Sequence, residues 1–148
     1  TTVLAFVSMR TEVQTQAIVE DAWRRGVTVA APRMTPSFDD LELRAWREGD
    51  ALEESGMMFL QPSEGAPAID EAAVDLVLVP ALAVDERGHR VGFGKGFYDR
   101  LLPRLANAAR VALIFDFERV AEVPERDGDV PVDAIVTDAR VVRCPRPS

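Results

Sequence analysis

The chain has 148 residues, of which 47% are hydrophobic and 28% are charged, and its formal net charge is −8. This length fits one domain with a buried core, and the charged fraction excludes an integral membrane protein. The excess of Asp and Glu also works against nonspecific binding to nucleic acid or anionic lipid, so a phosphate ligand has to be held by local cations. We therefore expect no nucleic-acid partner and no membrane partner.

Cysteine and histidine, which often mark disulfides and metal sites, occur once each. Cys144 cannot form an internal disulfide, and a lone His89 excludes a His-rich site and a Cys/His zinc cluster. We interpret Cys144 as a packing or incidental thiol and His89 as an exposed turn residue. The opening residues, TTVLAFVSM, show no basic leader and no cleavage pattern, so the predicted location is the cytoplasm. We expect a monomer.

Strand and helix patterns alternate in the first half of the chain. An apolar run at residues 3–9 predicts a strand, and the stretch 10–26 after it predicts a helix. Thr11 and Gln14 form a T-x-x-Q capping box at the start of that helix, and Gly26 supplies a stop at its end. Two further strands are predicted at residues 27–34 and 41–46.

The second half is dominated by aliphatic runs. Residues 61–75 collect Pro, Gly, Ser and acids, which indicates a surface connection with one short helical turn. Nearly continuous aliphatic segments are typical of strands buried on both faces of a parallel sheet. Three such segments stand at residues 74–85, 109–116 and 132–138. We therefore predict one α/β domain spanning residues 1–148, with a mostly parallel twisted sheet and helices on both faces.

Between two of these strands, residues 90–105 read RVGFGKGFYDRLLPRL and predict an anion site. Glycines at alternate positions let the backbone approach a ligand closely, and a helix predicted from about Phe97 would direct its positive end there. Lys95 adds a full positive charge that can neutralise phosphate oxygens. The spacing is neither GxxxxGK[ST] nor GxGxxG, so close packing of the turn stays open as an alternative.

Several neighbouring residues have both a structural and a ligand-binding interpretation. Asp99 and Asp129 can be a helix-cap acid and a solvated loop acid, or two ligands of a magnesium ion beside a nucleotide. Glu12, just beyond the first strand, can complement a helix dipole or face a substrate. Phe97 and Tyr98 can be core aromatics or a stacking surface for a flat ligand.

Taken together, the segment VDLVLVPALAVDERGHRVGFGKGFYDRLLPRL resembles the signature of the 5-formyltetrahydrofolate cyclo-ligase family, also called methenyltetrahydrofolate synthetase. The flanking stretches FVSMRTEVQT, AAPRM and VPERDGDVPVDAIVT are similar to the family's first strand, second strand and closing segment, in family order. The resemblance covers nearly the whole chain. It implies a three-layer, Rossmann-like fold, similar to the sugar-isomerase and CoA-transferase-like group.

The resemblance also implies an activity and a set of site residues. The activity is the ATP- and Mg²⁺-dependent conversion of 5-formyltetrahydrofolate to 5,10-methenyltetrahydrofolate, in which the formyl oxygen is phosphorylated and ADP and phosphate are released. Lys95 and Tyr98 would be catalytic, and Asp99 and Asp129 would hold Mg²⁺. The ATP site would be lined by Arg90, Val91, Gly92, Phe93, Gly94, Lys95, Gly96, Phe97 and Tyr98. The folate would contact Val7, Glu12, Phe93, Gly94, Lys95, Gly96 and Phe97.

The sequence departs from the family pattern in two ways. Ala81, Val84, Phe97, Glu118 and Gly128 replace the family's usual Gly, Phe, Tyr, Gln and His. The chain also starts at the first strand, without the family's basic N-terminal helical segment. A non-catalytic homologue that binds folate or nucleotide is therefore the alternative function. A different enzyme of the sugar-isomerase and CoA-transferase-like group is a third possibility, resting on fold analogy alone.

Overall fold

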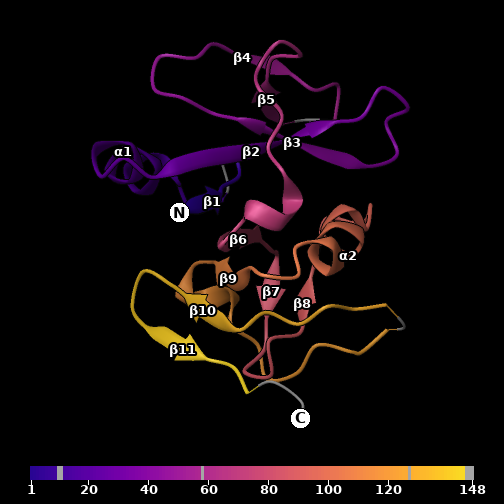
Figure 1. Ribbon diagram of the computed structural model, residues 1–148. Helices are drawn as coiled ribbons and strands as arrows, with labels where there is room; N and C mark the ends of the chain where they lie inside the picture. The colour runs from indigo at the N-terminus through magenta and orange to yellow at the C-terminus, as the bar shows by residue number, and fades with distance from the viewer. Residues whose placement is uncertain (10–11, 58, 127, 146–148) are drawn as a thin grey trace.

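The computed structural model describes residues 1–9, 12–57, 59–126 and 128–145 of the chain. Within this part, a seven-stranded sheet has the strand order β11-β10-β9-β6-β1-β2-β3 (Figure 1). The strands are β1 (Thr2–Leu4), β2 (Thr28–Met34), β3 (Leu41–Ala45), β6 (Leu76–Pro80), β9 (Ala109–Leu113), β10 (Ala134–Val136) and β11 (Val141–Arg143). The five inner strands run parallel, and only the edge strands β3 and β11 are antiparallel to their neighbours. The predicted mostly parallel α/β sheet is confirmed.

Helices cover both faces of the sheet. Adjacent residues of β2 point to opposite sides, so Val29 and Ala30 belong to two different core clusters. Helix α1 (Gln16–Arg24) packs Val19 into the cluster that contains Val29. Helix α2 (Phe97–Leu101) and the 3-10 turn η2 (Leu102–Arg104) bury Leu101 and Leu102 in the other. Each buried leucine contributes about 1.5–3 kcal/mol. In Figure 1 the two helices lie on opposite sides of the molecule.

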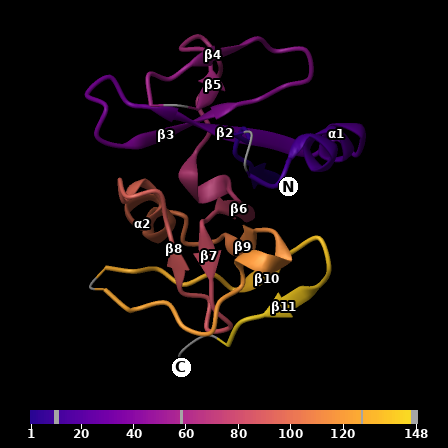
Figure 2. The same ribbon diagram turned by 180° about the vertical axis from the view of Figure 1, so that it is seen from behind.

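Smaller elements surround this sheet. Two-stranded sheets are formed by β4 (Leu52–Glu54) with β5 (Leu60–Pro62), and by β7 (Ala83–Val84) with β8 (Arg90–Val91). Single 3-10 turns are η1 (Glu71–Ala73) and η3 (Asp116–Glu118). The turn η1 confirms the short helical turn predicted in residues 61–75. Seen from behind in Figure 2, β4 and β5 stand at one end of the molecule and β10 and β11 at the other. None of the described helices has both the length and the apolar character that a membrane crossing requires.

The first predicted helix starts later than the capping box indicates, and the first strand is shorter. Helix α1 begins at Gln16 and β1 ends at Leu4, because the chain between them folds back on itself. The buried Thr15 hydroxyl donates to the carbonyl oxygen of Phe6 at 2.8 Å, and the Thr15 N–H donates to Ser8 Oγ at 2.9 Å. Thr11 lies outside the described residues. The helix ends as predicted, with Gly26 at a φ of +73°.

The aliphatic run at residues 74–85 is not one strand. It divides into β6 and β7, and only β6 belongs to the central sheet. The second part instead pairs with β8, with Val84 opposite Arg90, so that residues 83–91 form a hairpin. The hydrophobic pattern of the sequence could not reveal this break, because Val84 is as fully buried as Val79 and both are valines. The hairpin brings the chain back toward the carboxyl ends of the parallel strands.

Position 88 of this hairpin requires glycine, both because of its backbone conformation and because of the atoms around it. Gly88 has a φ of +87°, and a Cβ placed on it would lie 2.3 Å from the carbonyl oxygen of Val132. We predict that Gly88→Ala lowers the free energy of unfolding by about 3 kcal/mol or more, from backbone strain together with the clash. Gly26→Ala is the matched control, because Gly26 has a φ of +73° but no atom within 4 Å of its Cβ position.

Chemical denaturation of both variants checks this prediction. Gly26→Ala should lose only about 1 kcal/mol, the cost of the left-handed backbone alone. If both variants lost the same free energy of unfolding, the close approach of Gly88 to Val132 would not be what requires glycine at position 88.

Candidate active site

A cavity of about 610 Å³ lies outside the carboxyl ends of β1 and β6, the position where open α/β sheets bind ligands. Its walls include three stretches of chain that are distant in sequence: the loop after β1, the turn from β8 into α2, and the loop before β10. The lining includes every site residue predicted from the sequence, namely Val7, Glu12, residues 90–99 and Asp129. The fold thus brings the predicted site residues together around one cavity. The ligand that they bind stays a prediction.

The loop after β1 presents Glu12 through a tight turn. The Glu12 N–H donates to the carbonyl oxygen of Met9 at 3.1 Å, and the Met9 N–H donates to Glu12 Oε1 at 2.7 Å. Burial raises the pKa of Glu12, the hydrogen bond from Met9 lowers it, and the negative charge of Glu118 raises it further, with a net increase. Sequence analysis left open a dipole-complementing role for Glu12, but α1 begins four residues later, at Gln16. Its carboxylate instead lines the cavity.

Two of the three glycines in the glycine-lysine turn adopt positive φ, a backbone conformation that glycine tolerates and other residues rarely do. Gly94 and Gly96 have φ angles of +91° and +69°, whereas Gly92 does not adopt positive φ. The turn is held from outside by Arg100, whose guanidinium donates to the carbonyl oxygens of Lys95 at 3.0 Å and Asp39 at 2.8 Å. Helix α2 is only five residues long, so the contribution of its dipole is small.

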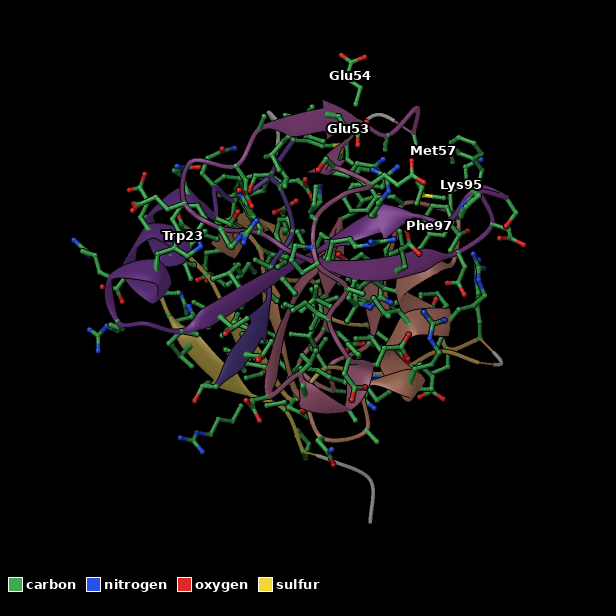
Figure 3. All side chains as sticks on the ribbon, turned by 45° about the horizontal axis from the view of Figure 1, so that its top comes forward. Trp23, Glu53, Glu54, Met57, Lys95 and Phe97 are labelled. Atoms are coloured by element: carbon green, nitrogen blue, oxygen red, sulfur yellow. The ribbon has the colours of Figure 1, made fainter. Side chains whose placement is uncertain are left out.

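Lys95 is exposed at the mouth of this cavity. Its ammonium group has no hydrogen-bond or ion-pair partner among the described residues. Figure 3 shows Lys95 close to Met57 and Phe97 on one side of the molecule, far from Trp23 on α1. Met57 and Phe97 pack against the core and also line the cavity. The interpretation of Phe97 as a core aromatic is confirmed, and its stacking on a flat ligand stays a prediction. Met58 lies outside the described residues.

Arg90 is the buried cation of the site. Its side chain is only 5% exposed, and its Nη2 donates to Asp99 Oδ1 at 2.9 Å. The guanidinium also lies 6.0 Å from the centre of the Tyr98 ring. Burial lowers the pKa of Arg90, while the charges of Asp99, Tyr98 and Asp129 raise it. Among the described residues Arg90 Nε has no hydrogen-bond partner. The predicted ATP-site arginine is thus held in place by the predicted metal-site acid.

The two predicted metal ligands could bind a Mg²⁺ ion only if phosphate oxygens or water completed its coordination shell. Asp99 Oδ1 is occupied by Arg90, and Asp129 Oδ2 accepts from the Arg126 N–H at 2.7 Å. Each carboxylate keeps one oxygen without a hydrogen bond to the described residues. These residues contain no cluster of three or more His, Cys, Asp or Glu side chains suited to a metal ion. Mg²⁺ commonly takes one or two carboxylates and completes its shell with phosphate oxygens and water, and the donor set here fits that pattern.

Tyr98 lines the cavity, and the charges of Glu12 and Arg90 both affect the pKa of its hydroxyl. Burial raises the pKa of its hydroxyl, the charge of Glu12 raises it further, and the charge of Arg90 lowers it, with a large net increase. The hydroxyl is therefore a neutral hydrogen-bond donor throughout the physiological range. Glu12, Tyr98 and Arg90 all line the cavity.

Sequence reasoning missed several features of this site. Arg126 adds a third cation to the lining, and only its position three residues before Asp129 could have indicated it. Met57 and Phe59 pack against the core and also line the cavity. His89, expected to be exposed, is 18% exposed in its side chain and lies 3.6 Å from Glu125. Cys144 is buried in the core, which confirms its interpretation as a packing thiol.

The fold and the site define the class of protein: it is an α/β protein with a cavity at the carboxyl ends of its parallel strands. The sequence model of the 5-formyltetrahydrofolate cyclo-ligase family matches residues 1–138. The chain belongs to this family, and the predicted class of enzyme is confirmed.

Named relatives agree with this assignment. The 5-formyltetrahydrofolate cyclo-ligase of Mycolicibacterium smegmatis is 33% identical over 144 residues, covering 94% of this chain and 74% of that protein. The Escherichia coli K12 cyclo-ligase is 30% identical over 144 residues, covering 95% and 79%. Among solved structures, 5,10-methenyltetrahydrofolate synthetase of Aquifex aeolicus superposes with a TM-score of 0.82 at 26% identity, covering 99% of this chain and 73% of that one.

The effect of Glu118 on the pKa of Glu12 allows a test of the electrostatics of the cavity. We predict that Glu118→Gln lowers the pKa of Glu12, because it removes a negative charge that raises that pKa. The glutamine oxygen can keep the hydrogen bond that Glu118 Oε1 accepts from the Phe115 N–H at 2.8 Å. Carboxyl NMR titration measures the shift, with the distant Glu20→Gln on α1 as control. An unchanged Glu12 pKa would show that the two acids do not interact.

The same shift has a consequence for stability. The folded-state pKa of Glu12 lies above its ordinary value of 4.5, so Glu12 contributes to stability fully below that pH. The contribution is lost as the pH rises through the folded-state pKa. Glu118→Gln should therefore lessen this loss.

Proposed function

We propose that the chain catalyses the ATP- and Mg²⁺-dependent conversion of 5-formyltetrahydrofolate to 5,10-methenyltetrahydrofolate. In this proposal the formyl oxygen attacks the γ-phosphorus of ATP and ADP leaves. N10 then attacks the formyl carbon, and the phosphorylated oxygen departs as inorganic phosphate. A formyl amide oxygen is a poor leaving group, and its phosphorylation makes departure possible. The protein's contribution is positioning and charge stabilisation.

One observation carries the proposal most directly. The cavity of about 610 Å³ joins Val7 and Glu12, the predicted folate contacts from the first loop, to the glycine-lysine turn predicted to hold ATP. Two substrates have to meet for phosphoryl transfer, and a shared cavity is the arrangement that permits an in-line approach. The names of the relatives, which are cyclo-ligases and a methenyltetrahydrofolate synthetase, support the same reaction.

Within this mechanism, the cations have separate roles. Lys95 is exposed and without a partner among the described residues, so it is available to neutralise the phosphoryl group that moves. Arg90 is buried against Asp99 and keeps the nucleotide side of the cavity in shape. The backbone N–H groups of residues 92–96 are available to the other phosphate oxygens.

The acids and Tyr98 take the remaining roles. Asp99 and Asp129 would hold Mg²⁺, which would supply positive charge to stabilise the negative charge of the phosphate groups. Glu12 would accept hydrogen bonds from the N–H groups of the pterin ring. The raised pKa of Tyr98 keeps its hydroxyl protonated, so it can donate a hydrogen bond to an oxygen that gains negative charge.

Two measurements test the proposal. Isothermal titration with Mg-ATP and with 5-formyltetrahydrofolate measures binding, and the growth of the methenyl product's absorbance measures turnover. Turnover by the full protein is the expected result. Binding of both ligands with no turnover would favour the alternative of a non-catalytic homologue, and binding of neither would overturn both.

We predict that Lys95→Ala lowers kcat by about 10²–10³-fold, the usual cost of removing one donor to a developing negative charge. Thermal stability should hardly change, because the side chain is exposed. The surface variant Arg24→Ala, on α1, is the control. Lys95 is also the only lysine in the chain. Mass spectrometry of acylation by an amine reagent should therefore show protection of Lys95 by Mg-ATP, and equal labelling with and without nucleotide would contradict this role.

We predict that Asp129→Asn raises the Mg²⁺ concentration needed for half-maximal activity by about tenfold or more, because an amide binds Mg²⁺ less strongly than a carboxylate. The KM for 5-formyltetrahydrofolate should stay the same. Asp21→Asn, which removes a paired surface acid on α1, is the control. An unchanged Mg²⁺ dependence would remove Asp129 from the proposed metal site.

The same proposal includes a monomer that acts in the cytoplasm with 5-formyltetrahydrofolate and ATP as its ligands, and without nucleic acid or membrane partners. The negative net charge of −8 supports the last part. A single domain over residues 1–148 stays a prediction.

A further inference from the structure

A buried carboxylate outside the cavity connects two of its walls. Asp85 stands at the tip of the β7–β8 hairpin, and its side chain is fully buried. Its Oδ1 accepts from the N–H groups of Arg87 at 2.9 Å and His89 at 3.1 Å, which closes the hairpin turn. Its Oδ2 accepts from Arg87 Nη2 at 2.9 Å and from the Val123 N–H at 2.8 Å. One carboxylate oxygen thus serves the hairpin, and the other holds a separate loop.

Among the described residues, three backbone N–H groups of that separate loop, residues 119–132, donate hydrogen bonds to the hairpin, and Glu125 of the loop also pairs with Arg87. The Val120 N–H donates to the carbonyl oxygen of Val84 at 3.0 Å, and the Val132 N–H donates to that of Gly88 at 2.9 Å. Between them lies the bond from Val123 to Asp85, which Arg87 reinforces by donating to the Val123 carbonyl oxygen at 2.9 Å. The bonds at Val123 and Val132 therefore bracket the stretch that carries Asp129.

The hairpin also sets the position of Arg90, because Arg90 lies in β8, opposite Val84. Arg90 and Asp129 line the same cavity, so the bracketed stretch reaches the site that holds the buried cation. Burial would raise the pKa of Asp85, but the hydrogen bonds from Val123, Arg87 and His89 outweigh it, and the net pKa is lowered. Asp85 is thus ionised, and an ionised acceptor makes the stronger hydrogen bonds.

We propose that Asp85 is a positioning residue, whose buried carboxylate fixes the loop 119–132 against the β7–β8 hairpin and so places Asp129 beside Arg90 and Asp99. Within the described part of the chain, Val123 is the only residue of the cavity lining that Asp85 hydrogen-bonds, and Asp85 acts through that loop. Its effect on Mg²⁺ dependence rests on the proposed function. Its effect on the loop does not.

Asp85→Asn separates the two tasks of the carboxylate. An asparagine can keep its oxygen toward the N–H groups of Arg87 and His89, which preserves the turn. Its NH₂ group then faces the Val123 N–H and Arg87 Nη2, where a donor meets donors and the bonds are lost. Ile135→Ala, a cavity-forming change in a buried residue of β10, is the control for general loss of stability.

Two readouts test the proposal on the full protein. Hydrogen exchange of the peptide that spans residues 119–132 should be about tenfold or more faster in Asp85→Asn, and close to wild type in Ile135→Ala once global unfolding is subtracted. The Mg²⁺ concentration for half-maximal turnover should rise by about tenfold or more, as for supporting residues of metal sites, with the KM for 5-formyltetrahydrofolate unchanged.

Each outcome decides the question. Wild-type exchange in Asp85→Asn would overturn the proposal, and so would faster exchange with an unchanged Mg²⁺ dependence. If the wild-type protein shows no turnover, the proposed function fails, and the exchange data still decide whether Asp85 fixes the loop. If Asp85→Asn does not fold, Arg87→Ala replaces it, because the half-exposed Arg87 bonds both Asp85 and the Val123 carbonyl oxygen. Wild-type exchange in Arg87→Ala would then overturn the proposal.

Discussion

The position of β1 between β2 and β6 is the constraint on which the cavity depends. Val3 pairs with Val29 on one side and with Leu76 on the other, and both neighbours run parallel to β1. Parallel strands deliver their carboxyl ends to the same edge of the sheet. The loop after β1 and the segment after β6 therefore emerge side by side, although some seventy residues separate them in the chain. The walls formed by the loop after β1 and by the segment after β6 follow from this pairing.

The charges in the cavity are balanced locally, against the charge of the whole chain. A chain with a net charge of −8 repels free phosphate, yet Arg90, Lys95 and Arg126 all line this cavity. Arg90 is buried and held by Asp99, while Lys95 is exposed and without a partner among the described residues. A buried ion pair stabilises a shape more than it supplies free charge. The division between a structural cation and an available one is what a phosphoryl-transfer site requires.

The inner strands of the sheet and one of its two edges were predictable from sequence. Long aliphatic runs predicted β6, β9 and β10, because strands buried on both faces leave a continuous apolar signal. The β-branched run at residues 27–34 predicted β2, and the strand predicted at residues 41–46 is the edge strand β3. The edge strand β11 was missed, since only its central residue Val142 is partly buried. The short pairs β4–β5 and β7–β8 were missed as well. Strands of two or three residues are too short to show a period, and tertiary hydrogen bonds define them.

For the site, the sequence determined which residues are available, and the tertiary structure decided how they pair. The order of strand, glycine-lysine turn and helix is local, so it could be read from RVGFGKGFYDR, and the long match to the family signature indicated the ligands. The partners of these residues are not local. Asp99 bonds Arg90 nine positions away, the charge of Glu118 raises the pKa of Glu12, and Asp85 holds Val123 from 38 positions away. A hydrogen bond between distant segments depends on where the sheet places both, and no sequence period records that placement.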